Sequence, residues 1–542
     1  MKTYHSSQKS RSSFANSDRL SVPKDGMAGL KENFKSDLLA GFLVFLLALP
    51  LSLGIAQAGE FPPAMGILTA MIGGMFVSFL AGSKITVKGP AAGLTTIYAG
   101  CVTALGAGLE GWHLTLGVCV VASILQIILG LLKAGSLSNF FPHAVVHGML
   151  AAIGLIIISK QVHILLGIDL ITLAGMKPLA LYAQIPSSIV HANNPIALIG
   201  VISLIVLFGM PRLDINLIKK IPAPMIVLLI AIPTATILDF QATQPEYILI
   251  KIGNFWESIG YNPDFSAIGT ITFWKFVAMF LIIGSLESSI TVKASDKMDP
   301  WKRHSDFNKD LVAIGVGNTL TGFLGGPPMI SEAVRSSANI SFGARTRWAN
   351  FFHGFFLFIA MLLLIPIIEL IPNTALAAVL IFVGYRLASP QEFVNAYKTG
   401  KEQFLIFCTT ITFILATDLL VGMLAGIIMK LLIHLINGAR FSSLFRACYQ
   451  LREEEGEYNL TVLDQAIFSN LMSFKKLFKK FKSGKKIIID FSQARLIDHT
   501  FMEFLEHFQA ESHENNNIVT VNGLERFQNF SDHPLSGRKI KK

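Results

Sequence analysis

Two short stretches rich in glycine and proline, Lys88-Gly-Pro-Ala-Ala-Gly93 and Gly325-Gly-Pro-Pro328, interrupt long apolar segments of this chain. The first begins about 51 residues after the start of the first apolar segment, and the second about 55 residues after the start of the segment at 271. A matched pair of interrupted segments is typical of membrane proteins built from two inverted repeats. We therefore predict repeats at about 37–240 and 271–437.

Composition also favours the membrane. Hydrophobic residues make up 52% of the 542 residues and charged residues 15%, against about 25% charged residues in an ordinary soluble chain. A soluble fold cannot bury that much apolar surface, so the composition indicates a polytopic α-helical membrane protein. It excludes a soluble enzyme, a disordered chain and a disulfide scaffold. We attribute the net charge of +10 to cytoplasmic segments and not to nucleic-acid binding.

Apolar runs long enough to cross or nearly cross a bilayer recur through the central part of the chain. Residues 1–36 precede them, are polar, carry seven Lys/Arg and show no signal-peptide pattern, so we expect a cytoplasmic N-terminus. The boundary between the last two runs rests on Asp418 alone. The runs are 37–57, 63–82, 86–107, 112–133, 143–165, 194–210, 221–239, 271–291, 309–325, 347–371, 373–388, 402–417 and 418–437.

Residues 440–542 have the composition of a small soluble domain, which we place in the cytoplasm. Short strands are predicted at 458–463, 486–491 and 518–521, where residues alternate or run apolar. Helical spacing covers 465–481 and 499–508. The order strand, helix, strand, helix, strand predicts an α/β domain.

Glu287 is the most informative single residue, because it lies inside the apolar sequence Phe280-Leu-Ile-Ile-Gly-Ser-Leu-Glu-Ser-Ser-Ile-Thr291. A carboxylate within a membrane helix is costly and indicates function. It suits a proton or Na⁺, and Thr291, four residues on, lies on the same helix face as a further oxygen ligand. The structural alternative is a glutamate that is hydrogen-bonded to a neighbouring helix.

Glu332 and Arg335 lie three residues apart, on one face of the helix expected to begin after Pro328 and to carry Ser331 in its first turn. A helix start offers free N–H groups and partial positive charge, and the Arg335 guanidinium suits an oxyanion. An ionised Glu332 repels an anion. It must therefore be protonated, pair with Arg335 or hold a co-transported cation; a plain structural Glu332–Arg335 pair is the other possibility.

The break at Pro90 supplies a second helix start. Ala91, Ala92 and Gly93 are small, so their backbone N–H groups can approach a ligand closely. If the two starts face each other, their positive ends favour an anion near the middle of the membrane.

Two other patterns have weaker functional interpretations. His143 and His147 have the spacing of metal ligands, but no third ligand is evident and we predict no metal site. The seven lysines of 475–486 alternate with aromatic and apolar residues, which fits either a helix on an anionic membrane surface or the solvated face of an amphipathic helix. The sequence has no Walker, Rossmann or nucleophile-elbow motif, so ATP-driven transport and enzymatic activity have no support.

Several stretches resemble the sulfate permease (SulP) family of anion transporters, and together they cover about 30–525. Asp37-Leu-Leu-Ala-Gly-Phe and Ala48-Leu-Pro-Leu-Ser-Leu-Gly resemble the family's first membrane segment, Lys88-Gly-Pro-Ala-Ala-Gly its third, and Phe141-Pro followed by Val145-Val-His-Gly-Met its fifth. Lys486-Ile-Ile-Ile-Asp-Phe-Ser and Leu496-Ile-Asp-His-Thr resemble a STAS domain.

The resemblance implies fourteen membrane segments in a 7+7 inverted repeat. It implies a core domain of segments 1–4 and 8–11, a gate domain of segments 5–7 and 12–14, and a substrate between segments 3 and 10. Glu287 and Thr291 match the Na⁺-site positions of related bicarbonate transporters. Ser331, Glu332 and Ala333 match the substrate loop, and Arg335 matches a basic residue often found there. Glu332 departs from the small residue of those relatives, so their ion coupling cannot simply be copied.

We therefore expect a secondary transporter of a small inorganic oxyanion, sulfate or bicarbonate, in the cell membrane. The anion would be held at Pro90, Ala91, Ala92, Gly93, Ser331, Glu332, Ala333 and Arg335, and the coupling cation, H⁺ or Na⁺, at Glu287 and Thr291. No cofactor is predicted, both termini are expected in the cytoplasm, and the family implies a homodimer. The alternatives are a nucleobase–proton symporter of the same architecture, an uncoupled anion channel, and a signalling scaffold or enzyme built on the C-terminal domain.

Overall fold

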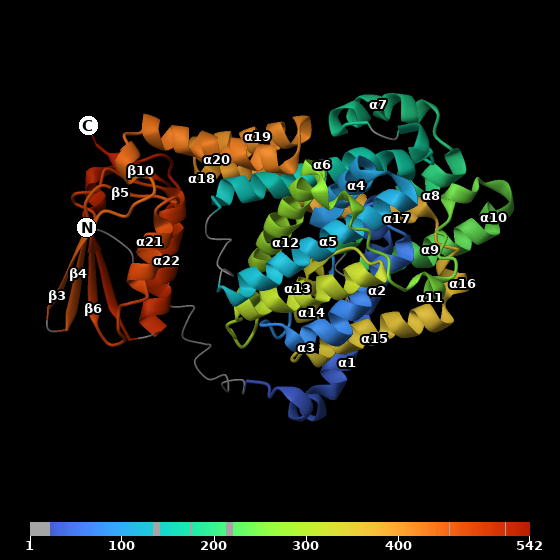
Figure 1. Cartoon of the computed structure of the whole chain (residues 1–542), viewed down its shortest axis with the longest axis horizontal. Coiled ribbons are helices and arrows are strands. Elements are labelled where there is room, and N and C mark those ends of the chain that lie inside the picture. Colours follow the sequence, from blue (N-terminus) through green and yellow to red (C-terminus); the bar gives the residue numbers. More distant parts are fainter. Residues whose placement is uncertain are drawn as a thin grey trace.

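The computed structural model describes residues 22–133, 141–173, 176–212, 221–454, 456–514 and 516–541. A large helical bundle extends to Ile436, and a smaller domain with strands follows it (Figure 1). Within the described residues, seven helices are long and apolar enough to cross a membrane, and three shorter apolar helices accompany them. The predicted class, a polytopic helical membrane protein followed by an α/β domain, is confirmed.

The helices divide evenly between the predicted repeats. Setting aside α7, α18 and helices of four residues or fewer, the described part of each half holds seven. The first half contains α1 (Gly26–Ala58), α2 (Pro63–Ile72), α4 (Thr95–Leu105), α5 (Gly108–Leu131), α6 (His143–Leu165), α8 (Asn194–Gly209) and α9 (Ala223–Ile237). The second half contains α12 (Ile271–Met298), α13 (Phe307–Leu324), α14 (Ala333–Ser341), α15 (Trp348–Leu363), α17 (Asn373–Leu387), α19 (Lys401–Ala416) and α20 (Leu419–Ile436).

The remaining helices of the membrane part are short. Two of them, α7 (Pro178–Val190) and α18 (Pro390–Thr399), occupy corresponding places, since each connects the fifth segment of its half to the sixth. The others are α3 (Ser78–Leu80), α10 (Phe240–Thr243), α11 (Phe255–Ser258) and α16 (Ile365–Ile368).

Helix packing separates a core bundle from a gate bundle, as the resemblance implies. In the core, α1 packs on α15, α5 on α13, and α12 on α4, α5 and α14. In the gate, α17 packs on α6 and α8, and α19 on α6 and α20. Small residues allow the close approach: a Cβ added to Gly154 of α6 would lie 2.4 Å from the carbonyl oxygen of Gly384 in α17.

Three predicted helix starts are wrong. The helix expected to open at Lys88 begins only at Thr95, because Lys88–Pro90 form a strand and Ala92–Leu94 a 3-10 turn. Helix α1 begins at Gly26 and not at residue 37, because the side chain of Asp25 caps it by accepting the Gly26 N–H. The helix expected after Pro328 begins only at Ala333, since Met329–Ser331 form a strand. The weak boundary at Asp418 is correct, because this residue caps α20 by accepting the Val421 N–H at 3.0 Å.

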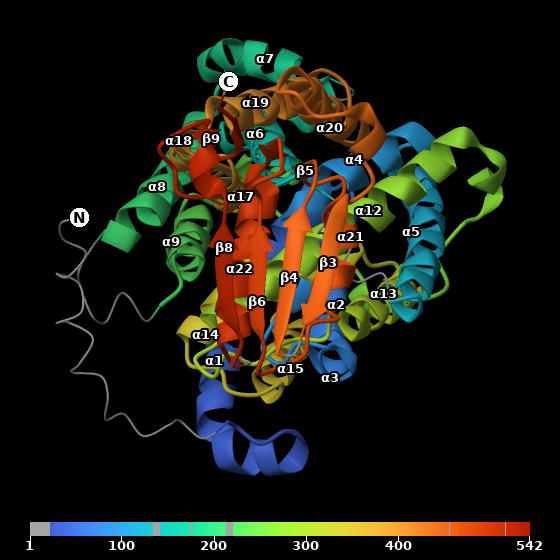
Figure 2. The ribbon, with the colours of Figure 1, turned by 90° about the vertical axis from the view of Figure 1, so that its left-hand side faces the viewer.

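The C-terminal domain has a four-stranded sheet of order β3-β4-β6-β8, formed by Tyr449–Glu454, Glu457–Val462, Lys486–Asp490 and Ile518–Asn522. Figure 2 shows this sheet face-on, and Figure 1 shows helices α21 (Leu471–Phe478) and α22 (His499–Glu514) between the sheet and the membrane bundle. The three predicted strands are confirmed, and the domain fits the STAS-like prediction. A second sheet joins β5 (Gln465–Ala466), β7 (Leu496–Ile497), β10 (Arg538–Ile540) and β9 (Phe527–Asn529).

The helix predicted at 465–481 is shorter than expected, because its first residues form β5 and α21 begins at Leu471. The apolar side chains between its lysines, Phe474, Leu477 and Phe478, are buried in the core of the domain. They are not available to enter a membrane surface. The structure therefore favours the interpretation of this run as the solvated face of an amphipathic helix.

A buried ion pair anchors the C-terminal domain to the gate. Lys430 of α20 has no exposed side-chain surface, and its Nζ lies 2.9 Å from Oδ2 of Asp498 and 2.8 Å from the Thr500 hydroxyl. The Asp498 carboxylate also accepts the N–H groups of Phe468 and Phe501. Burial alone would raise the pKa of Asp498, but Lys430, His434 and these hydrogen bonds outweigh it and lower this pKa.

We predict that Lys430→Met destabilises the contact between the two domains by about 3–5 kcal/mol, because it leaves a buried carboxylate without its partner. Thermal unfolding and limited proteolysis of the region after Ile436 measure the effect. The double variant Lys430→Met/Asp498→Leu should recover much of the loss. Lys486→Met is the control, since its pair with Glu457 is on the surface and should change stability by less than about 1 kcal/mol. Equal losses in both single variants would contradict the anchoring role.

Candidate functional site

The two interrupted segments meet as a pair of short antiparallel strands. β1 (Lys88–Pro90) pairs with β2 (Met329–Ser331) in the register Lys88 to Ser331, Gly89 to Ile330 and Pro90 to Met329. After β1 a 3-10 turn, Ala92–Leu94, leads into α4, and after β2 Glu332 leads into α14. The pairing places the two half-helix starts next to each other, because the Ala92 N–H donates to Oε1 of Glu332 at 3.3 Å.

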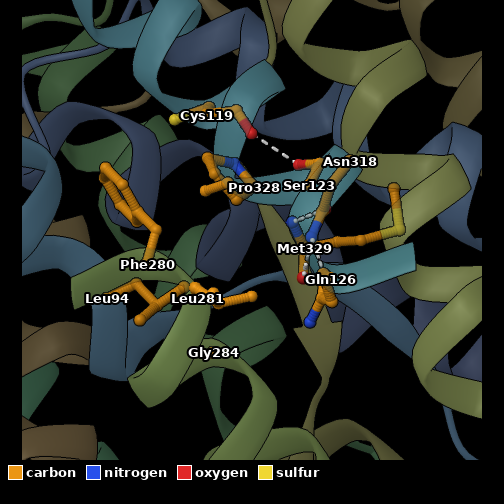
Figure 3. A pocket seen from close by; sticks show the side chains of 11 residues that line it. Leu94, Cys119, Ser123, Gln126, Phe280, Leu281, Gly284, Asn318, Pro328 and Met329 are labelled. Carbon is orange, nitrogen blue, oxygen red and sulfur yellow. Dashed lines mark hydrogen bonds between the residues drawn. The ribbon is translucent and has the colours of Figure 1, made fainter. Parts of the chain in front are cut away.

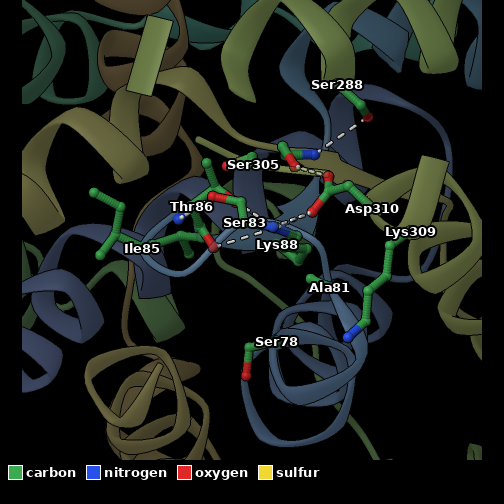
Figure 4. Close-up of polar contacts among 12 residues, drawn as sticks. Ser78, Ala81, Ser83, Ile85, Thr86, Lys88, Ser288, Ser305, Lys309 and Asp310 are labelled. Atoms are coloured by element: carbon green, nitrogen blue, oxygen red, sulfur yellow. Dashed lines mark hydrogen bonds and ion pairs between the residues drawn. The ribbon is translucent and has the colours of Figure 1, made fainter. Parts of the chain in front are cut away.

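A buried acid holds the strand pair from one side (Figure 4). Asp310 of α13 forms an ion pair with Lys88, Nζ to Oδ1 3.0 Å, and its Oδ2 accepts the Ser331 hydroxyl at 3.1 Å. Lys88 also donates to the Thr86 hydroxyl, and the Ser331 N–H donates to the Ser288 hydroxyl at 3.3 Å. The predicted substrate residue Ser331 is therefore already hydrogen-bonded through both its hydroxyl and its amide.

Amide and phenol groups hold the other end of the strand pair, where Pro90 lies opposite Met329. Asn318 accepts the Met329 N–H at 2.6 Å and donates to the Met329 carbonyl at 3.0 Å. Gln126 connects Asn318 to Ser285 of α12. Tyr98 of α4 donates to the Pro328 carbonyl at 2.6 Å, so it ties one half-helix to the loop before the other.

A cavity beside this network contains none of the predicted site residues (Figure 3). It is lined by Leu94, Cys119, Ala122, Ser123, Gln126, Phe280, Leu281, Gly284, Asn318, Pro328 and Met329. The predicted residues lie instead in a packed region, where side chains fill the space between the two half-helices.

Two buried carboxylates converge on the start of α4. A Cβ added to Gly93 would lie 1.8 Å from Oε1 and 2.4 Å from Oε2 of Glu287, so this carboxylate packs directly on the glycine. Glu332 reaches the neighbouring Ala92 N–H. Both glutamates are 6% exposed, and Oε1 of Glu287 has no hydrogen-bond partner among the described residues. Thr291, one turn further along α12, is buried as well.

Arg335 is the most unusual group of the site. It is fully buried, and none of its three guanidinium nitrogens has a hydrogen-bond partner within the described chain. A Cβ added to Gly89 of β1 would lie 2.4 Å from its Nη1, so the guanidinium packs against the strand pair. Buried charged groups are normally hydrogen-bonded, so three unpaired nitrogens indicate a place for an anionic ligand.

The Glu332 carboxylate accepts an N–H from the other half-helix and is not hydrogen-bonded to Arg335. The opposite charges of Glu332 and Arg335 still act on each other, so any pairing of the two is electrostatic and not a hydrogen-bonded contact. Ala91 is near by, its N–H 3.4 Å from the Tyr98 hydroxyl, and Ala333 is the first residue of α14.

Several residues of this region were not predicted from the sequence as site residues, among them Lys88, Asp310 and His353. His353 of α15 is buried, and both of its ring nitrogens lack partners among the residues described. The sequence does contain a signal for Lys88 and Asp310, since a charged residue within an apolar segment indicates a functional or structural site. Nothing in the sequence shows that they pair.

Comparisons with known proteins agree with this architecture. The model of the Sulfate permease family matches residues 34–410 of this chain. The putative sulfate transporter YvdB of Bacillus subtilis is 26% identical over 407 residues, which cover 73% of this chain and 73% of YvdB. The bicarbonate transporter BicA of Picosynechococcus sp. is 23% identical over 404 residues, which cover 73% of this chain and 69% of BicA.

Solved structures share the fold at low sequence identity. The transmembrane domain of a cyanobacterial bicarbonate transporter, BicA, gives a TM-score of 0.62 at 20% identity over 73% of this chain and 97% of that one. The murine Solute Carrier 26 family member A9 anion transporter, in the inward-facing state, gives 0.66 at 14% identity over 90% of this chain and 85% of that one. Because the family model matches well over half of its length, this chain belongs to the sulfate permease family.

Proposed function

We propose that this protein is a secondary active transporter of a small inorganic oxyanion, sulfate or bicarbonate. The unpaired, fully buried guanidinium of Arg335 beside two half-helix starts is the observation that carries this proposal. A planar guanidinium is a donor group that oxyanions prefer, and the partial positive charge of a helix start also favours an anion. The names of the relatives support the same substrates, since YvdB is named a putative sulfate transporter and BicA a bicarbonate transporter.

We propose that transport is coupled to a cation, and that a proton is the better candidate than Na⁺. Two carboxylates and one guanidinium share the site, so an anion that enters it meets a net negative charge unless a carboxylate is neutralised. Two acids that converge on the same backbone segment tend to share one proton. Glu287, with a carboxylate oxygen that accepts no hydrogen bond from any described residue, is the group we assign to carry it.

Transport itself would proceed by alternating access, in which the core bundle moves against the gate bundle. The site residues fit this scheme, because Glu287 lies in α12, Glu332 directly before α14 and Arg335 within α14, all in the core. We place the protein in the cell membrane with both termini in the cytoplasm, and we expect a homodimer. On this proposal the protein transports a substrate and catalyses no reaction.

Arg335→Gln should abolish sulfate and bicarbonate uptake and weaken anion binding by about 10- to 100-fold, the range expected when a charge-assisted hydrogen bond is lost. Arg335→Lys keeps the charge but not the fork of donors, and should restore only part of the affinity. The affinity of each variant for sulfate and bicarbonate is measured with detergent-solubilised protein. Full uptake by folded Arg335→Gln protein would contradict the assignment.

Purified protein in liposomes should accumulate labelled sulfate or labelled bicarbonate under an inward proton gradient, while a Na⁺ gradient alone should have no effect. Glu287→Gln should abolish this accumulation and retain equilibrium exchange of the anion, because the amide cannot release a proton. Accumulation driven by a Na⁺ gradient alone would show that Na⁺, and not a proton, is the coupling cation. Uracil competition would indicate a nucleobase symporter, and conductance that survives Glu287→Gln would indicate a channel.

Gly93→Ala should impair coupling, because the new methyl group would occupy the space of the Glu287 carboxylate. Displacing that side chain should cost about 1–3 kcal/mol of stability and reduce proton-driven uptake. Gly100→Ala is a matched control in the same half-helix, since its Cβ would meet only Phe276 at 3.7 Å. Equal uptake by the two variants would show that Glu287 does not need its position beside Gly93.

A further inference from the structure

Four histidine rings form a row across the contact between the gate and the C-terminal domain. His143 is the first residue of α6 and His499 the first residue of α22, and the centroids of these two rings lie 5.9 Å apart. On the gate side, the ring of His147 stacks on that of His143 with their centroids 4.0 Å apart. On the domain side, the ring centroid of His533 lies 6.0 Å from that of His499. We call these four residues the histidine row.

Hydrogen bonds on the domain side require neutral rings. Nδ1 of His499 lies 2.7 Å from the Leu535 carbonyl, which can only accept, so this nitrogen carries the proton of the ring. The Leu535 N–H donates to Nδ1 of His533 at 3.2 Å, so that nitrogen is unprotonated. His499 is 6% exposed, so a second proton on its ring would create a charge that is largely removed from water.

Positive charge surrounds the two central rings. His143 and His499 each stand at a helix start, where the partial charge is positive. The ammonium of Lys430, which has no exposed side-chain surface, acts on both rings. Burial lowers the pKa of His499 and Lys430 adds to this change. The groups that oppose it without reversing it are the Leu535 carbonyl, Glu503 and Asp498.

The nearby carboxylates have other partners. Asp498 lies 2.9 Å from Nζ of Lys430 and accepts two backbone N–H groups. Because these partners lower its pKa, Asp498 stays ionised between about pH 5 and pH 8, and the anchor itself does not titrate there. Glu392 of α18 contacts the outer end of the row, 2.9 Å from Nδ1 of His147. The other charged or titratable groups that act on the row or on its anchor are Lys297 of α12, Glu402 of α19, His434 of α20 and Glu503 of α22.

We propose that the histidine row makes the docking of the C-terminal domain sensitive to pH: acid protonates His499 and His143 and weakens the contact with the gate. Separation would expose the His499 ring to water, where an imidazole takes up a proton near pH 6.5. In the docked protein the same ring takes up its proton only at lower pH. Since the separated state binds more protons, docking is strongest above about pH 6.5 and weakens progressively as the pH falls.

The proposal concerns the attachment of the domain and does not depend on which substrate is transported. Because we place this domain in the cytoplasm, the row would respond to cytoplasmic pH. The contact of the domain with the gate would then be looser in an acidified cell than in a neutral one.

Docking is measured by energy transfer between fluorophores on Lys398→Cys in α18 and Lys480→Cys after α21, both exposed positions. The full chain is used in nanodiscs, with Cys408 and Cys448 replaced by serine. The urea concentration at which energy transfer is lost gives the docking constant at each pH. We expect this constant to fall by about tenfold or more between pH 7.5 and pH 5.5, the effect of at least one proton taken up on separation.

His499→Gln should reduce this change to less than about threefold, because an amide takes up no proton in this range. His191→Gln is the control, since this histidine is exposed at the end of α7, outside the row, and should keep the wild-type pH dependence. A wild-type change of less than about threefold, or an equal change in wild type and His499→Gln, would overturn the proposal.

A second pair of variants tests the charge argument at a position where folding is not at risk, because His143 is exposed. His143→Lys places a permanent positive charge opposite His499 and should weaken docking by about tenfold already at pH 7.5, as acid does in the wild type. His143→Gln, which is neutral, should dock like the wild type at this pH. Equal docking of the lysine and glutamine variants at pH 7.5 would contradict the role of charge in the row.

Discussion

The pairing of β1 with β2 is the constraint on which the membrane part of this protein depends. Segments that interrupt helices inside a bilayer leave backbone N–H and C=O groups unsatisfied, and lipid offers them no partners. Here the two interrupted segments pair as antiparallel strands, so their backbone groups hydrogen-bond to each other. Asp310 then fixes the pair, since it holds Lys88 of one strand and Ser331 of the other. A buried ion pair adds little net stability, so we attribute to it the fixed register that keeps both half-helix starts in one place.

That fixed register has an electrostatic consequence. Two helix starts attract an anion, but the carboxylates of Glu287 and Glu332 lie at one of them and repel it. On the proposed function, occupation by an anion would therefore be favoured only when a cation neutralises a carboxylate, and a cation would bind more tightly when the anion is present. Coupling of this kind needs no movement within the site. It would follow from the placement of opposite charges in a buried region.

Local signals in the sequence predicted the two breaks, the membrane helices and the position of Glu287 inside one of them, because each depends on composition or on residues near in the chain. The same local rules predicted a helix directly after Pro328, and there they failed. Met329–Ser331 pair with β1 instead, a long-range interaction that outweighs helix propensity. Ser331 shows the same limit at the site: as a serine near a helix start it was a reasonable substrate ligand, but Asp310 already accepts its hydroxyl. Local rules cannot predict the Lys88–Asp310 pair either, because the two residues are far apart in the sequence.

The C-terminal domain extends this reasoning to the whole molecule. Because Lys430 is buried against Asp498, the domain follows the gate. Because Lys297 meets His507, the same domain also touches the core through the helix that carries Glu287. A body fixed to one bundle and in contact with the other must change its contacts whenever the bundles move. The contact that yields is the exposed one, since breaking the buried ion pair would leave a carboxylate without solvent or partner. On the proposed function, movement of the core against the gate would therefore change the Lys297–His507 contact at the end of α12 first.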